Sequence, residues 1–126
     1  MTMLDYKLDY WESKSLDLLR EATSPLGIKA SCTNTTNYGA VFTRDAVMSG
    51  IAGLLYNDDD IITGLRATLD MLHKLKGNQG QIASNYKVAD NQIGDVSFGT
   101  LSPKIDAATW YLVAIGLLMN LSLIHI

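Results

Sequence analysis

The sequence has 126 residues, of which 48% are hydrophobic and 18% are charged, and its formal net charge is −3. This hydrophobic content excludes a disordered chain, and the length fits one domain or a piece of a larger one. The acidic balance, without a cluster of Lys and Arg, argues against a nucleic acid or an anionic membrane as partner. A lone Cys32 excludes an internal disulfide, and with no secretory signal we expect a cytoplasmic protein.

The first 38 residues predict one helix followed by a loop. From Leu4 to about Ala22 the apolar residues lie mostly three to five apart, which predicts an amphipathic helix with one apolar stripe. The segment Ser24–Gly27 contains a proline and a glycine, which end the helix. Residues 30–38 are rich in Ser, Thr and Asn and are typical of a loop.

A second helix is predicted from Arg44 to about Tyr56, with Thr43 as its N-terminal cap. It contains Gly50 and Gly53, and glycine costs about 1 kcal/mol relative to alanine inside a helix. The two glycines therefore predict that another backbone approaches this helix closely.

The second half of the chain predicts two more helices joined by a long loop. Leucines and an isoleucine three or four apart predict a third helix over residues 61–75, which the acidic residues 58–60 cap. Residues 76–104 are long for a connection, whose median is about 4–6 residues, and predict a functional loop pinned by its apolar side chains. A fourth helix starts near Asp106. Its apolar run over 110–119 is shorter than the about 20 residues of a membrane span, so we expect a buried core helix and a mainly α fold.

Two helix starts carry the candidate chemistry. Arg44 and Asp45 form either an ordinary solvated first turn or a clamp on sugar hydroxyls, with Arg44 donating and Asp45 accepting hydrogen bonds. Asp106 is either a helix-start acid or a general acid at the mouth of a pocket, if neighbours such as Trp110 shield it from water. The residue pattern leaves both alternatives open.

Metal and cofactor chemistry are not expected. His73 and His125 have no second ligand at metal spacing, and residues 58–60 lack the pattern of a calcium loop. The sequence contains no phosphate-binding glycine loop, and Cys32 has no Cys-x-x-Cys partner that would suggest a nucleophile.

Several short motifs follow one another in a specific order. They are Ser24–Ser31, Asn37–Asp45, Gly80–Asn85, Ser97–Gly99 and Ser102–Trp110. In this order and spacing they resemble the N-terminal catalytic region of the six-hairpin (α/α)6-barrel glycoside hydrolases. Among them the sequence resembles the neutral/alkaline invertases and bacterial amylo-α-1,6-glucosidase-like proteins, and the resemblance covers roughly residues 16 to 119.

The resemblance implies a partial (α/α)6 toroid of about four helices, with the long loop near a saccharide substrate. It implies that Asp106 is the general acid and that the sugar pocket includes Tyr38, Phe42, Arg44, Asp45, Asn85 and Trp110. The segment after the acid usually reads Asp-Ser-Gly in such invertases but Asp106-Ala107-Ala108 here. This departure bears on sucrose specificity more than on the acid role.

Glycosidic cleavage normally takes two carboxylates on opposite sides of the bond, and the resemblance implies that the second lies far downstream. Twelve helices of about 11–12 residues with their loops need well over about 200 residues. We therefore expect residues 1–126 to be the N-terminal part of a catalytic domain whose C-terminal part is missing, with 121–126 non-native. The alternatives are a small non-catalytic helical interaction protein and, less favoured, a membrane anchor over 110–126. The sugar, the linkage, the stereochemical outcome and the oligomeric state stay open.

Overall fold

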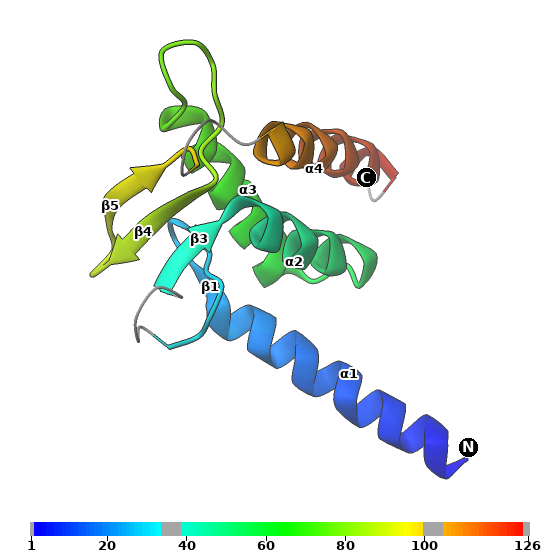
Figure 1. The fold of residues 1–126 in the computed structure, drawn as a ribbon. Coiled ribbons are helices and arrows are strands. Elements are labelled where there is room, and N and C mark those ends of the chain that lie inside the picture. Colours follow the sequence, from blue (N-terminus) through cyan, green and yellow to red (C-terminus); the bar gives the residue numbers. More distant parts are fainter. Residues whose placement is uncertain (1, 34–38, 100–104, 125–126) are drawn as a thin grey trace.

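The computed structural model describes residues 2–33, 39–99 and 105–124 (Figure 1). The described residues form a mainly α fold, which confirms the predicted class. The elements in chain order are α1 (Met3–Ala22), β1 (Thr23–Ser24), β2 (Gly27–Ile28), β3 (Ala40–Phe42), α2 (Thr43–Leu55), α3 (Asp59–Lys74), β4 (Asn85–Ala89), β5 (Gln92–Ser97) and α4 (Ile105–Ile124).

The four predicted helices are confirmed within one or two residues at each end that was predicted. Asp58 caps α3, because its side chain accepts a hydrogen bond of 3.1 Å from the backbone N–H of Ile61. The expected cap of α2 is wrong. Thr43 is the first helical residue, and its hydroxyl donates instead to the carbonyl of Ala83 at 2.6 Å.

The prediction of a loop throughout residues 76–104 is wrong, because part of this segment forms a hairpin. Strands β4 and β5 pair antiparallel, and β3 pairs with the other edge of β4, so that the sheet has the order β3-β4-β5. At the hairpin turn Asp90 and Asn91 have φ values of 51° and 58°, the left-handed conformation that a tight turn requires. Residues 100–104 lie outside the described part.

The core lies between α2, α3 and the sheet. Val41 of β3, Tyr86 of β4 and Leu65 of α3 are fully buried in it. A Cβ added to Gly50 would lie 2.5 Å from Leu65 Cδ1, and one added to Gly53 would lie 2.5 Å from Ile61 Cγ2. The glycines therefore allow the close approach of a neighbouring element, which is α3. The atoms nearest to them are mainly side-chain atoms of Leu65 and Ile61, whereas the prediction was of a backbone.

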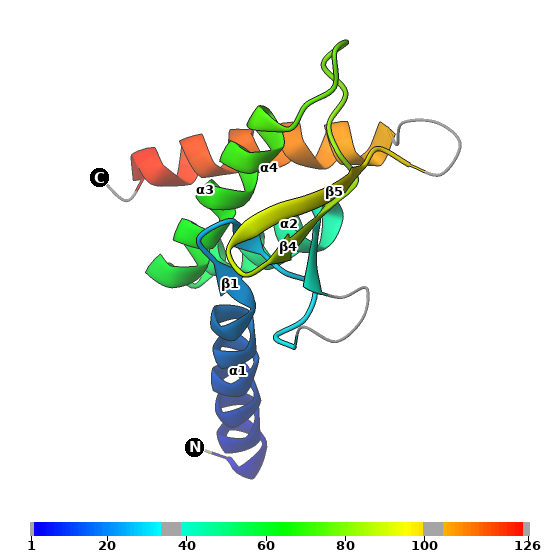
Figure 2. The same cartoon turned by 90° about the vertical axis from the view of Figure 1, so that its left-hand side faces the viewer.

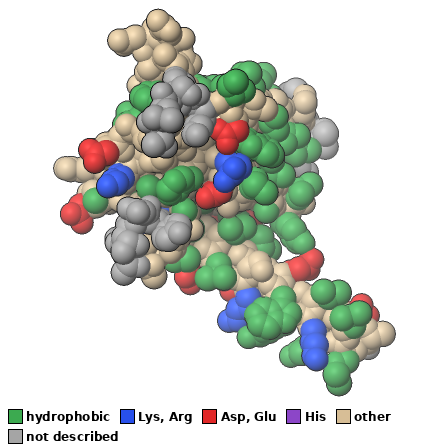
Figure 3. Space-filling model, viewed as in Figure 1, with side chains coloured by type: hydrophobic (Ala, Val, Ile, Leu, Met, Phe, Trp, Pro, Cys, Tyr) green, Lys and Arg blue, Asp and Glu red, His purple; other side chains and the backbone are tan. Residues whose placement is uncertain are grey.

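Helices α1 and α4 leave apolar side chains uncovered (Figure 3). Helix α4 buries Ala107 and Ala114, whereas Leu112 and Met119 are 67% and 62% exposed. The prediction of a helix buried on all sides is therefore wrong within this chain. Helix α1 projects away from the body. None of the helices in the described segments combines the length and hydropathy that would carry it through a lipid bilayer.

Candidate active site

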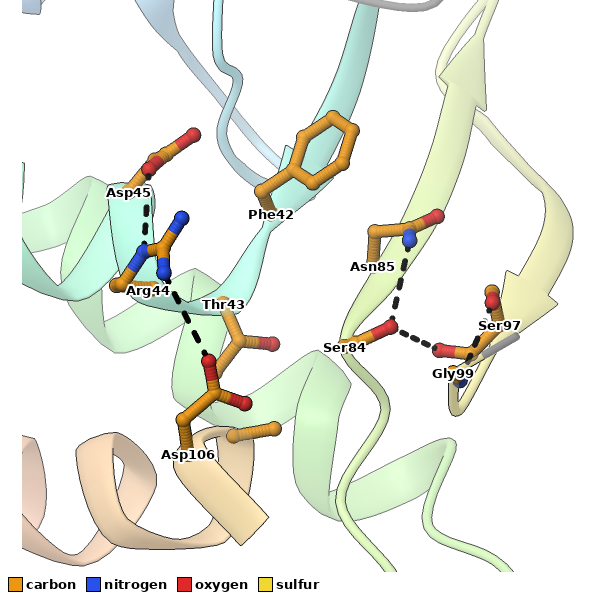
Figure 4. Close-up of a pocket in the computed structure, with 10 residues that line it drawn as sticks. Phe42, Thr43, Arg44, Asp45, Ser84, Asn85, Ser97, Gly99 and Asp106 are labelled. Atoms are coloured by element: carbon orange, nitrogen blue, oxygen red, sulfur yellow. Dashed lines mark hydrogen bonds and ion pairs between the residues drawn. The ribbon is translucent and has the colours of Figure 1, made fainter. Parts of the chain in front are cut away.

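The first turns of α2 and α4 meet the ends of the sheet strands around a cavity of about 390 Å³ (Figure 4). This places residues that are far apart in the sequence at one end of the fold. The lining residues are Phe42, Thr43, Arg44, Asp45, Ser84, Asn85, Ser97, Gly99, Asp106 and Ala107.

Backbone hydrogen bonds fix the floor of this cavity. The N–H of Thr43 donates to the carbonyl of Ser84 at 2.9 Å, in addition to the buried bond from the Thr43 hydroxyl to Ala83. The N–H and the hydroxyl of Ser84 both donate to the carbonyl of Ser97, at 2.8 and 3.0 Å. These hydrogen bonds tie the start of α2 to the beginning of β4 and the end of β5. They therefore fix the backbone position from which Arg44 and Asp45 reach the cavity.

The central strand connects the polar and the apolar wall of the cavity. Asn85 is the register partner of Phe42 on one side and of Ser97 on the other. Its Nδ2 atom lies 3.4 Å from the Ser84 hydroxyl oxygen, to which it donates. The ring of Phe42 supplies an apolar surface beside these polar groups (Figure 4).

Arg44 lies between two carboxylates. Its Nε atom is 4.0 Å from Oδ1 of Asp45, and its Nη1 atom is 3.8 Å from Oδ2 of Asp106. These distances exceed those of hydrogen bonds, and the side chains are 62%, 53% and 50% exposed in the order Arg44, Asp45, Asp106. Ion pairs of this kind add little to stability. The guanidinium donors and the carboxylate acceptors are thus arranged at the cavity rather than within the core.

The chemistry of this arrangement suits a polyhydroxyl ligand. A sugar hydroxyl is both a donor and an acceptor, and here carboxylate acceptors alternate with guanidinium donors over a short distance. An apolar wall such as Phe42 complements the less polar face of a sugar ring. In residues 2–33, 39–99 and 105–124, no three His, Cys, Asp or Glu side chains gather in a way that could hold a metal ion.

The structure brings together most of the residues singled out from the sequence. Phe42, Arg44, Asp45, Asn85 and Asp106 all line the cavity. Trp110, on the next turn of α4, is partly buried against the core and is not among the lining residues. Tyr38 lies outside the described residues.

The sequence reasoning missed the residues that shape the floor. Thr43 was assigned to a cap, and Ser84 and Ser97 were given no role, although both lie in the motifs that carry the resemblance. Apolar residues that alternate with polar ones at 86 and 88, and again at 96 and 98, were the available signal for strands at this place.

The comparison with known proteins gives one match to report. The chain is similar to an alkaline/neutral invertase of Arabidopsis thaliana, with 27% identity over an alignment 124 positions long that covers 82% of this chain. The matched part is 22% of that invertase, so the chain spans about a fifth of the length of this relative. No family model and no solved structure matches the chain.

Proposed function

We propose that this chain carries part of the active site of a glycoside hydrolase of the invertase type or the amylo-α-1,6-glucosidase type. The main observation in support of this proposal is the cavity at which Arg44, Asp45 and Asp106 lie together. The similarity to an invertase supports the same assignment. Under this proposal the helices belong to an incomplete (α/α)6 toroid, and the ligand is a saccharide.

In the proposed mechanism Asp106 acts as the general acid. It protonates the glycosidic oxygen as the bond to the anomeric carbon breaks, so that the leaving sugar departs as an alcohol. Its place at the first turn of α4 lets the carboxyl group reach a substrate bound in the cavity. The carboxyl group is half exposed and Trp110 does not line the cavity, so in this proposal the shielding from water comes from the C-terminal part of the domain.

Arg44 and Asp45 orient the sugar in this proposal. Asp45 accepts hydrogen bonds from sugar hydroxyls, Arg44 donates to ring or hydroxyl oxygens, and Asn85 adds an amide at the opposite wall. Such contacts hold the substrate so that its glycosidic oxygen faces the acid.

The second carboxylate, which activates water or attacks the anomeric carbon, lies outside this chain in the proposal. It belongs to a C-terminal part of the same domain, which supplies the opposite side of the cavity. The coverage of about a fifth of the invertase supports this division. We therefore expect the 126-residue chain to bind sugars weakly and to have negligible hydrolase activity.

The test is a titration of the isotope-labelled chain with sucrose, maltose and isomaltose, followed by amide NMR. Binding in about the millimolar range should shift the amides of the cavity residues. Asp106→Asn should change those shifts, whereas the matched control Asp95→Asn, whose side chain is 93% exposed on β5, should not. No shift with any sugar would overturn the saccharide assignment. Robust hydrolysis by the chain alone would overturn the division of the site.

A second candidate function is a non-catalytic helical interaction protein. The exposed apolar residues of α1 and α4 favour it, because large uncovered apolar faces mark interaction surfaces. A cooperative monomer that shows no sugar-induced shift and binds a partner through these helices would favour this alternative.

A further inference from the structure

Four of the exposed apolar residues of α1 follow a heptad pattern, whereas Met3, Tyr6 and Tyr10 are exposed outside it. Leu4, Leu8, Trp11, Ser15 and Leu18 are separated alternately by four and three residues. Each of the four apolar members is more than half exposed. Alternating spacings of three and four place side chains on a narrow seam, which is the a/d pattern of a coiled coil.

The charged residues on the two flanks of this seam have opposite signs, with lysines on one flank and acids on the other. In heptad terms Leu4, Trp11 and Leu18 occupy d and Leu8 and Ser15 occupy a. Lys7 and Lys14 then fall at g on one flank, and Asp5 and Glu12 fall at e on the other. All four charged side chains are exposed. Residues at e and g set partner choice and orientation in coiled coils.

This sorting fits a second copy of the same helix in parallel orientation. In a parallel pair a g residue faces the e residue of the next heptad, so Lys7 faces Glu12 of the partner subunit. An antiparallel pair would place lysine opposite lysine and acid opposite acid, which is unfavourable.

The position of α1 leaves this seam accessible. Helix α1 extends away from the body of the fold (Figures 1 and 2). Only towards its C-terminal end does it meet the core, where Leu16 and Leu19 are partly buried and Ala22 is buried. The accessible stretch from Leu4 to Leu18 amounts to about four helical turns. At its edge Tyr56 donates a hydrogen bond of 2.6 Å to Glu12, which ties one e residue to the body of the fold.

We propose that α1 is a dimerisation helix, in which residues 4–18 pair in parallel with the same helix of a second copy. The pairing buries Leu4, Leu8 and Trp11 between the two helices. This pairing is independent of the proposed sugar site, because no residue of α1 lines that cavity and the charged residues of the site belong to α2 and α4.

The first test is sedimentation of the full 126-residue chain at protein concentrations from about 10 µM to 1 mM, a range that captures a weak dimer. We expect a monomer–dimer equilibrium. Leu8→Asp should weaken dimerisation at least about tenfold, because it places a charge in the seam. Met48→Asp is the matched control, since Met48 is also exposed but lies on α2, and it should leave the equilibrium unchanged. A monomer at every concentration overturns the proposal.

A charge exchange tests the parallel orientation. At low salt Lys7→Glu and Glu12→Lys should each weaken the dimer, and the double variant should restore it. Tyr56→Phe, measured alongside, separates loss of the Tyr56 hydrogen bond from the charge effect and should leave the dimer intact. If each single exchange strengthens the dimer, or if the double variant does not recover, the parallel pairing is wrong.

Discussion

The Nη1 atom of Arg44 lies 3.8 Å from Oδ2 of Asp106, across the gap between the first turn of α2 and the first turn of α4. The contact is too long and too exposed to hold the two helices together. The burial of Ala107 and the hydrogen bonds of Thr43 fix the helix starts instead. The charged groups are therefore presented at the cavity by a scaffold that does not depend on them.

Replacement of Arg44 by glutamine should lower sugar affinity without lowering stability. Loss of a charged donor to a sugar oxygen costs about 1.4 kcal/mol, or about tenfold in the dissociation constant. The free energy of unfolding should change little, because the side chain is 62% exposed. The measurement is an NMR titration with the sugar that binds best. Lys87→Gln, an exposed cation on β4, is the control that should leave affinity unchanged.

Asp58 should contribute more to stability than the other acids at the start of α3. Its side chain is only 9% exposed, caps the helix, and accepts a hydrogen bond of 2.8 Å from Nε of Arg20. Asp58→Ala should therefore lower the free energy of unfolding by about 1 to 3 kcal/mol. Asp58→Asn should cost less, since asparagine also caps helices. Urea denaturation measures both, with the exposed Asp59→Asn as the control that should have little effect.

The same carboxylate should make stability depend on pH in acid. Burial on its own would raise the pKa of Asp58, but the hydrogen bonds from Arg20 and from the N–H of Ile61 outweigh it and hold the pKa below its usual value. A lowered pKa means that the ionised form stabilises the fold above the unfolded value of about 3.9. This contribution is lost as the pH falls through the folded pKa. Thermal unfolding from pH 5 to pH 2 should show a smaller loss for Asp58→Asn than for the parent chain.

Two glycine-to-alanine substitutions should have opposite signs. At Gly50 a new methyl group would meet Leu65 Cδ1 at 2.5 Å, so Gly50→Ala should destabilise the fold by about 1 to 3 kcal/mol despite its better helix propensity. At Gly116 on α4 nothing lies within 4 Å, and Gly116→Ala should stabilise the fold by about 0.5 to 1 kcal/mol. Equal effects in urea denaturation would contradict the close packing of α2 on α3.

The helices could be predicted because their signals are local. The repeat of leucines in α3 and the acid at its start act within a few residues of one another. The hairpin was missed because its turn, Asp90-Asn91, has no glycine to mark it. The pairing of β4 with β3 was missed because it joins residues far apart in the sequence. Tyr86 and Val88 alternate with polar residues, but a short alternation inside a polar segment also fits a loop.

The candidate site could be predicted only where a charge marked it. The sequence places charged residues at two predicted helix starts, so Arg44, Asp45 and Asp106 could be proposed as site residues. The N–H and the hydroxyl of Ser84 both donate to the carbonyl of Ser97 across the hairpin, and no sequence pattern predicts such a contact. The exposure of α4 could not be predicted either. Its apolar sequence indicates that the helix is more stable when buried, but it does not indicate whether residues of the same chain pack against it.

Tyr86 should remain protonated until the protein unfolds. Burial raises its pKa well above the usual value, which a hydrogen bond with Thr68 offsets only in part, and its hydroxyl donates to the carbonyl of Leu26 at 2.6 Å. Because the folded pKa is higher than the unfolded one, the neutral phenol stabilises the fold below about pH 10, and this contribution is lost as the pH rises further. Absorbance at alkaline pH should thus contain a tyrosinate component that appears together with unfolding. Tyr86→Phe should lack that component and unfold about 1 to 2 kcal/mol more easily, since the Leu26 carbonyl loses its partner. Ionisation of Tyr86 in the folded protein would contradict its burial.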